Sequence, residues 1–198
     1  RAKMLRVSAL LLAAVAVAAD FRVKFEVEVP SGAKEFTVLV HEDWAPIGAA
    51  RFRELVEAKF YDDTRFFRVL PSFMVQFGLA ADPDVSSSWR AKTIMDEPVK
   101  VTNKPGYMTF AKTGAPNSRT TQLFINYVDN GRLDGMGFAP FAEVEGDGMK
   151  VVKEIHNCGE SPQQGTVQSQ GNSYLDKKFP ELSKIKAATI LPDEGKEL

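Results

Sequence analysis

The stretch RFFRVLPSFMVQFG, residues 65–78, poses the first structural question about this chain. From Phe66 to Phe77 it contains eight large apolar side chains, together with one arginine, Arg68, and one glutamine, Gln76. A guanidinium or amide group among apolar side chains is costly in free energy unless it makes hydrogen bonds or takes part in a function. These two polar residues therefore need a specific reason.

The composition is that of a globular protein, because 44% of the 198 residues are hydrophobic and 26% are charged. A chain of this length can bury a sizeable core, and no linker-like segment interrupts it, so we predict one domain. The 25 basic and 26 acidic residues give a formal charge of −1, and we expect no nucleic-acid partner. Cys158 is the single cysteine, which excludes an intrachain disulfide and a thiolate metal cluster.

The first 19 residues have the layout of a secretory signal peptide. Arg1, Lys3 and Arg6 precede an apolar run over 7–19 that ends in small residues ahead of Asp20. The alternatives are a buried helix or a membrane anchor, but the run is shorter than the roughly 20 residues that span a bilayer. We therefore predict removal of residues 1–19, a mature domain over 20–198, and a place in the secretory pathway, either secreted or in the ER lumen.

The pattern along the chain predicts a mainly β protein. Alternating apolar and polar residues indicate a hairpin over 21–29 and 35–41. Pro46 and the apolar spacing after it indicate a helix over 46–58. The further elements expected are strands over 66–70, 73–77, 107–111, 122–127 and 185–192, a second helix over 149–157 and a polar loop over 80–92. Strands this numerous favour an antiparallel barrel or sandwich with helices over its open ends.

Common catalytic sites find no support in the sequence. His41 and His156 have no ligand-spaced partners, so we interpret both as ordinary histidines. There is no Gly-x-Ser-x-Gly elbow, no phosphate-binding loop and no Gly-x-Gly-x-x-Gly motif, which argues against nucleophilic hydrolysis and nucleotide binding. The remaining candidate residues are apolar and amide side chains.

Several motifs, in matching order and spacing, resemble those of the cyclophilin family of peptidyl-prolyl cis-trans isomerases. They are FFRVLPSFMVQFG (66–78), AKTG (111–114), TQLFIN (121–126), LDG (133–135) and GFAPFAEVEGDGMKVVKEI (137–155). The similarity spans about 35–155, and the chain after about 158 looks like a C-terminal extension. The resemblance implies a closed antiparallel eight-stranded barrel capped by two helices, in a divergent member of the family.

The resemblance also implies a site for proline-containing peptides and for unfolded or loop segments of proteins. The catalytic residues would be Arg68 and Gln76, and the substrate-binding residues would be Phe73, Met74, Ala111, Lys112, Gln122, Phe124 and Leu133. Twisting an X-Pro amide needs no covalent step, so no cofactor and no metal is expected. We further expect a monomer with no membrane contact after signal removal.

Some positions depart from the family pattern. Phe67 replaces the usual histidine before the arginine, which should change the polarity of the groove. Arg132 stands where many members have the tryptophan that contacts cyclosporin, so we expect weak cyclosporin binding. Two alternatives to an isomerase stay open: a proline-peptide binding module with little turnover, and an interaction function of the extension on a passive barrel.

Overall fold

The computed structural model describes residues 19–192. The predicted signal peptide lies almost entirely in the segment 1–18, outside the described residues, and stays a prediction. The strands are β1 (Phe21–Val29), β2 (Gly32–Val40), β3 (Arg68–Leu70), β4 (Met74–Phe77), β5 (Tyr107–Phe110), β6 (Leu123–Asn126), β7 (Pro140–Val144) and β8 (Lys184–Ile190). The helices are α1 (Pro46–Glu57), α2 (Pro83–Arg90), α3 (Gly148–Val152) and α4 (Gln164–Lys178), with a 3-10 helix η1 (Gly131–Met136).

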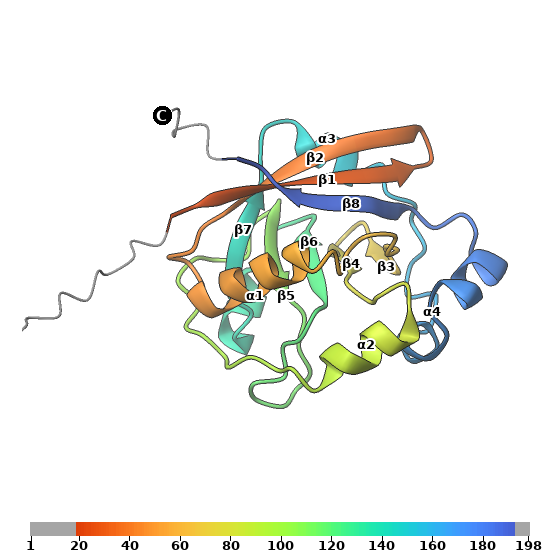
Figure 1. Cartoon of the computed structure of the whole chain (residues 1–198). Helices are drawn as coiled ribbons and strands as arrows, with labels where there is room; N and C mark the ends of the chain where they lie inside the picture. Colours follow the sequence, from red (N-terminus) through yellow and green to blue (C-terminus); the bar gives the residue numbers. More distant parts are fainter. Residues whose placement is uncertain (1–18, 193–198) are drawn as a thin grey trace, which may run out of the picture.

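The eight strands form one curled antiparallel sheet in the order β3-β4-β6-β5-β7-β2-β1-β8 (Figure 1). The mainly β class and the eight antiparallel strands are confirmed, but the prediction of a closed barrel is wrong. The outer edge of β3 pairs with Gly159, because Val69 and Gly159 exchange backbone hydrogen bonds of 3.0 and 3.1 Å. Strand β3 makes no ladder with β8. The segment just before β3 meets β8 only at an isolated bridge between Arg65 and Lys184, and the sheet is an open half-barrel.

Most predicted elements are present with slightly different ends. The hairpin is tighter than expected, since β1 and β2 are separated only by Pro30 and Ser31. The predicted helix over 149–157 is shorter, because its last turns are closed by i to i+3 bonds, from Glu154 N–H to Val151 O and from Ile155 N–H to Val152 O. Strand β7 was not identified separately from the sequence.

The predicted polar loop over 80–92 is wrong, because it contains helix α2. Asp82 is the N-cap, and its side chain accepts a hydrogen bond of 2.8 Å from the Asp84 N–H. Pro83 stands at the first helical position. Arg90 is the last residue of the helix, where its positive charge interacts favourably with the negative end of the helix dipole. These are ordinary helix start and stop signals, so this helix could have been found from the sequence.

Within residues 19–192, four α-helices accompany the sheet instead of the two expected. Helix α1 packs on β7 and β8, and α3 packs on β2. Helices α2 and α4 pack against each other, on the side of the sheet where β3 and β4 lie (Figure 1).

Over residues 19–192, no helix is both long enough and apolar enough to cross a membrane.

The period of two along the strands answers the question posed by residues 65–78. Val69, Val75 and Phe77 point into the main core and are at most 1% exposed. Their neighbours in the sequence, among them Arg68 and Gln76, point to the opposite face. The two polar residues therefore share one face of β3 and β4, away from the main core.

A second, smaller core fixes the segment between α3 and β8. Phe67, which is 1% exposed, packs with Leu79 and with Val167 and Leu175 of α4. We expected Phe67 to change the polarity of the groove, but its side chain is instead buried under this segment. The departure from the family histidine therefore provides an apolar anchor for α4.

Candidate active site

All nine predicted site residues line one groove with a cavity volume of about 500 Å³. They are Arg68, Phe73, Met74, Gln76, Ala111, Lys112, Gln122, Phe124 and Leu133. The groove is of the size that binds small ligands or a short stretch of peptide. The structure thus brings together residues that are up to 65 positions apart in the sequence.

Strand register places the central residues of the groove side by side. Arg68 of β3 is the partner of Gln76 in β4, and Gln76 is the partner of Phe124 in β6. Because directly opposed residues on neighbouring strands present their side chains on the same face, these three side chains form a row across the sheet. Met74 lies two residues from Gln76 and therefore joins the same face.

The polar half of the row is a chain of hydrogen bonds. Arg68 Nη1 donates to Gln76 Oε1 at 3.2 Å, and Gln76 Nε2 donates to Gln122 Oε1 at 2.8 Å. These two bonds fix the orientation of the Gln76 side-chain amide, and Gln76 is only 6% exposed. The guanidinium of Arg68 also lies over the ring of Phe73, with 5.8 Å from Cζ to the ring centroid. Both contacts hold the guanidinium at the mouth of the groove.

The apolar half is a cluster separate from the main core. Met74, Phe124 and Leu133 are buried together, and Phe73, Ala111 and Phe138 pack against them. Phe124 and Phe138 meet edge to face with their centroids 5.8 Å apart, a favourable geometry for two aromatic rings. The cluster offers an apolar surface of the kind that receives a pyrrolidine ring.

Leu133 is held in this cluster by the turn that carries it. The next residue, Asp134, accepts hydrogen bonds from the backbone and side-chain N–H groups of Asn103 at 3.0 and 2.7 Å, and another from the Thr102 hydroxyl. Burial raises the pKa of the Asp134 carboxyl, but these hydrogen bonds outweigh burial and hold the pKa below its ordinary value. Asp134 is therefore ionised at neutral pH and anchors η1 to the chain before β5.

A residue that the sequence did not single out completes the surroundings of Arg68. Arg68 Nε donates to Glu160 Oε2 at 2.6 Å, and Arg68 Nη2 donates to Glu160 Oε1 at 2.8 Å. The hydrogen bond from Arg68 lowers the pKa of the Glu160 carboxyl. Glu160 is thus a carboxylate at neutral pH, and it holds one edge of the guanidinium in a two-point ion pair.

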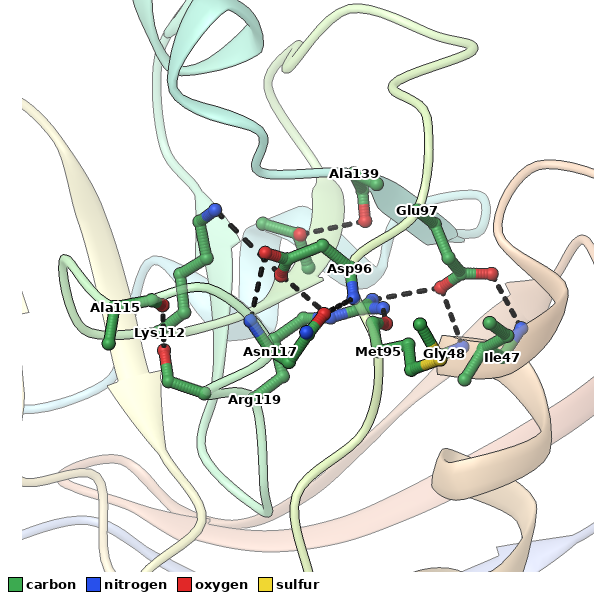
Figure 2. A network of polar contacts seen from close by, with 12 residues as sticks. Ile47, Gly48, Met95, Asp96, Glu97, Lys112, Ala115, Asn117, Arg119 and Ala139 are labelled. Carbon is green, nitrogen blue, oxygen red and sulfur yellow. Dashed lines mark hydrogen bonds and ion pairs between the residues drawn. The ribbon is translucent and has the colours of Figure 1, made fainter.

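The loop between β5 and β6 forms another wall of the groove, and a polar network holds it (Figure 2). Asp96 and Asn117 exchange hydrogen bonds, with the Asp96 N–H donating to Asn117 Oδ1 at 2.7 Å and the Asn117 N–H donating to Asp96 Oδ2 at 3.0 Å. Lys112 Nζ lies 3.9 Å from Asp96 Oδ1. Arg119 donates through Nη1 to Glu97 Oε2 at 2.9 Å. The wall is therefore fixed to the segment around 96–97.

The family model described as cyclophilin type peptidyl-prolyl cis-trans isomerase/CLD matches residues 23–172 of this chain. The chain belongs to the cyclophilin-type peptidyl-prolyl cis-trans isomerase family. The matched region covers most of β1 and all of β2 to β7, and it contains all nine predicted site residues.

Individual relatives agree with this assignment. Peptidyl-prolyl cis-trans isomerase of Acinetobacter baylyi is 32% identical over 159 residues, which cover 78% of this chain and 84% of that protein. Peptidyl-prolyl cis-trans isomerase B of Escherichia coli is 35% identical over 129 residues, covering 61% and 77%. A crystal structure of a Cryptosporidium parvum cyclophilin has a TM-score of 0.64 at 19% identity, covers 88% of this chain and 99% of that one, and shows the shared fold. The activity of the chain is therefore that of a cyclophilin-type isomerase.

Sequence reasoning missed part of the groove of this cyclophilin. The additional lining residues are Arg90, Thr93, Thr113, Ser118, Thr120, Phe138, Gln164 and Gln168. The neighbours of Ala111 and Gln122 in the sequence could have suggested the loop residues. Nothing in the sequence pattern indicates that Gln164 and Gln168 of α4 reach the groove, because they are more than 85 positions from Arg68 and Gln76.

His41 and Cys158 lie outside the groove and have local partners, and the Cys158 thiol lies 3.8 Å from the Phe66 carbonyl oxygen. His41 Nδ1 lies 2.7 Å from Asp20 Oδ2, and His41 Nε2 lies 3.2 Å from Glu143 Oε1. The His41 ring also stacks on Trp44 with a centroid distance of 3.9 Å. Burial raises the pKa of the Cys158 thiol to about 11, so this cysteine is a thiol and not a thiolate at neutral pH.

Proposed function

We propose that Arg68 and Gln76 are the groups of this isomerase that act on the twisting X-Pro bond, and that Met74, Phe124 and Leu133 receive the proline ring. The observation that carries the proposal is the row in which Arg68, hydrogen-bonded to Gln76, borders the apolar cluster in one groove. A ring seated on the cluster would bring its amide next to the guanidinium. The proposed substrates are proline-containing peptides and exposed loop or unfolded segments of proteins.

The chemistry required is modest. Rotation about a peptide bond crosses a barrier of about 18–20 kcal/mol because twisting removes the amide resonance. In the twisted state the prolyl nitrogen regains a lone pair and accepts a hydrogen bond better than in the planar state. A guanidinium N–H that donates to this nitrogen therefore stabilises the transition state more than the ground state. Gln76, fixed by Gln122, would hold the guanidinium and the substrate oxygen in register.

We expect the chain over 20–198 to accelerate cis-trans exchange of an Ala-Pro test peptide, as measured by NMR exchange spectroscopy. In the same samples, the methyl signal of Met74 should shift on peptide addition, because this side chain lies in the apolar cluster. Met149 of α3 lies outside the groove and provides the matched control signal. A folded protein that shows the Met74 shift without accelerating exchange would support the binding-module alternative. Acceleration with a shift at Met149 instead would place the site elsewhere.

Weak binding of cyclosporin is the second expected result. Arg132 is exposed at the rim, with its guanidinium 4.7 Å from the centroid of the Phe73 ring, and it offers no indole surface or indole N–H to the ligand. We expect a dissociation constant above about 1 µM by calorimetry, and an Arg132→Trp variant that binds at least about tenfold tighter. A submicromolar value for the native chain would contradict the prediction.

A further inference from the structure

The ion pair on Arg68 comes from a part of the chain far away in the sequence. Glu160 follows Gly159 in the segment that leads from α3 to α4, 92 residues after Arg68. Its two carboxylate oxygens accept from Nε and Nη2 at 2.6 and 2.8 Å. Two parallel N–H to O bonds fix both the position and the plane of a guanidinium, which a single contact does not.

The backbone next to Glu160 is itself fixed to the strand that carries Arg68. Gly159 exchanges two hydrogen bonds with Val69, the residue after Arg68. The Gly159 backbone has a φ of +63°, a conformation that glycine adopts without the strain that a side chain would cause. Arg68 precedes Val69 and Glu160 follows Gly159, so each of the two side chains extends from a residue next to this hydrogen-bonded pair.

The rest of the segment is also anchored to the body of the protein. Arg65, which lies three residues before Arg68 and is 7% exposed, donates to Asp176 of α4 at 2.8 Å. Asn172 of α4 donates through its backbone N–H to Ala81 O at 2.9 Å. Together with the burial of Phe67 under α4, these contacts give Glu160 a defined approach to Arg68.

The geometry leaves the working edge of the guanidinium available. An arginine has five N–H donors. In this structure, Glu160 accepts from two of them and Gln76 accepts from a third. The remaining two N–H groups, one on Nη1 and one on Nη2, can still donate to a substrate. The carboxylate therefore restrains Arg68 without taking all of its donors.

We propose that Glu160 is a positioning residue for the isomerase reaction, which holds the Arg68 guanidinium in the orientation that acts on the X-Pro bond. The inference rests on the proposed role of Arg68. Without the carboxylate, the arginine side chain keeps the contacts with Gln76 and the Phe73 ring but gains rotamer freedom at the groove mouth, where its side chain is 25% exposed. Each turnover would then have to restrict that freedom again.

The test compares Glu160→Ala and Glu160→Gln with the native chain. The side chain of Glu160 is 65% exposed, so both variants should fold. We expect kcat for the Ala-Pro peptide to fall about tenfold in Glu160→Ala, with little change in KM, because orientation acts in the transition state. Glu160→Gln should lose less, since its amide oxygen can accept one of the two bonds. The Arg68 Nε signal in ¹⁵N NMR should broaden or shift in both variants.

Two comparisons separate this inference from a general structural effect. Glu181→Ala removes an exposed carboxylate between α4 and β8 and should leave kcat unchanged. In an Arg68→Ala background, measured at raised enzyme concentration, Glu160→Ala should have no further effect. An equal loss in both backgrounds, an unchanged rate, or a faster rate in Glu160→Ala would each overturn the proposal. If Arg68→Ala itself retains full activity, the proposed role of Arg68 fails first, and the two failures are thereby distinguished.

Discussion

Replacement of Arg119 by methionine is expected to lower the free energy of unfolding by about 3–5 kcal/mol, the usual loss when one partner of a buried ion pair is removed. The side chains of Arg119 and Glu97 are 2% and 3% exposed. Methionine fills much of the same volume but leaves the Glu97 carboxylate buried without its cation. Urea unfolding at neutral pH, with the native chain beside the variant, measures the difference.

The loss should be large because Glu97 has a second task at the start of α1. Ala45, the N-cap residue, offers no side-chain acceptor, and Glu97 instead accepts from the Ile47 and Gly48 N–H groups at 2.6 and 2.8 Å (Figure 2). The first turn of a helix has backbone N–H groups without partners in the helix and carries a partial positive charge. Arg119, in the loop that forms the groove wall, donates to the Met95 carbonyl and to Glu97. Through Glu97, it therefore joins this wall to α1.

Two further variants make this prediction specific. Lys150→Met breaks the exposed pair between Lys150 and Asp147, whose side chains are 76% and 83% exposed, and should cost less than about 1 kcal/mol. The double variant Arg119→Met with Glu97→Gln should be more stable than the sum of its single changes implies, because no buried carboxylate is then left unpaired. Additive losses would show that Arg119 and Glu97 do not act as a pair.

The face of the sheet that forms the groove could be predicted from the sequence. In β4 and β6, alternate residues are core residues, so Gln76 and Phe124 had to share the other face once the strands were paired. The motif resemblance implied that Gln76 and Phe124 belong to one site, which the period of two alone does not. For this reason all nine predicted residues lie in one groove.

The segment after Cys158 could not be placed in the same way. Helix α4 buries few apolar side chains, and its regular backbone is interrupted at Gly171, so it has no continuous apolar stripe that would indicate its partner. Its apolar contact with Phe67 joins positions about 100 residues apart. The pairing of Gly159 with Val69 of β3 likewise joins positions 90 residues apart and has no local signal in the sequence.

Replacement of Arg68 by alanine is expected to lower kcat for an Ala-Pro peptide about 10²- to 10³-fold, the usual effect of removing one donor that acts on the transition state. The apolar cluster of Met74, Phe124 and Leu133 remains in the variant, so the affinity for the peptide should change little. Exchange spectroscopy gives kcat, and a titration of the same samples gives the dissociation constant. Arg68→Lys keeps the charge but loses the planar fork, and should recover only a small part of the rate.

The matched control for this result is Arg53→Ala. Arg53 lies on α1, outside the groove, and its guanidinium also pairs with a carboxylate, since Nη2 lies 3.0 Å from Glu42 Oε1. Both substitutions remove one paired guanidinium from the protein, but only the one at Arg68 removes donors from the row that borders the apolar cluster. A loss of kcat in Arg68→Ala alone therefore ties turnover to the row. If peptide affinity falls in Arg68→Ala while the exchange rate of bound peptide is unchanged, the arginine serves binding and not bond rotation.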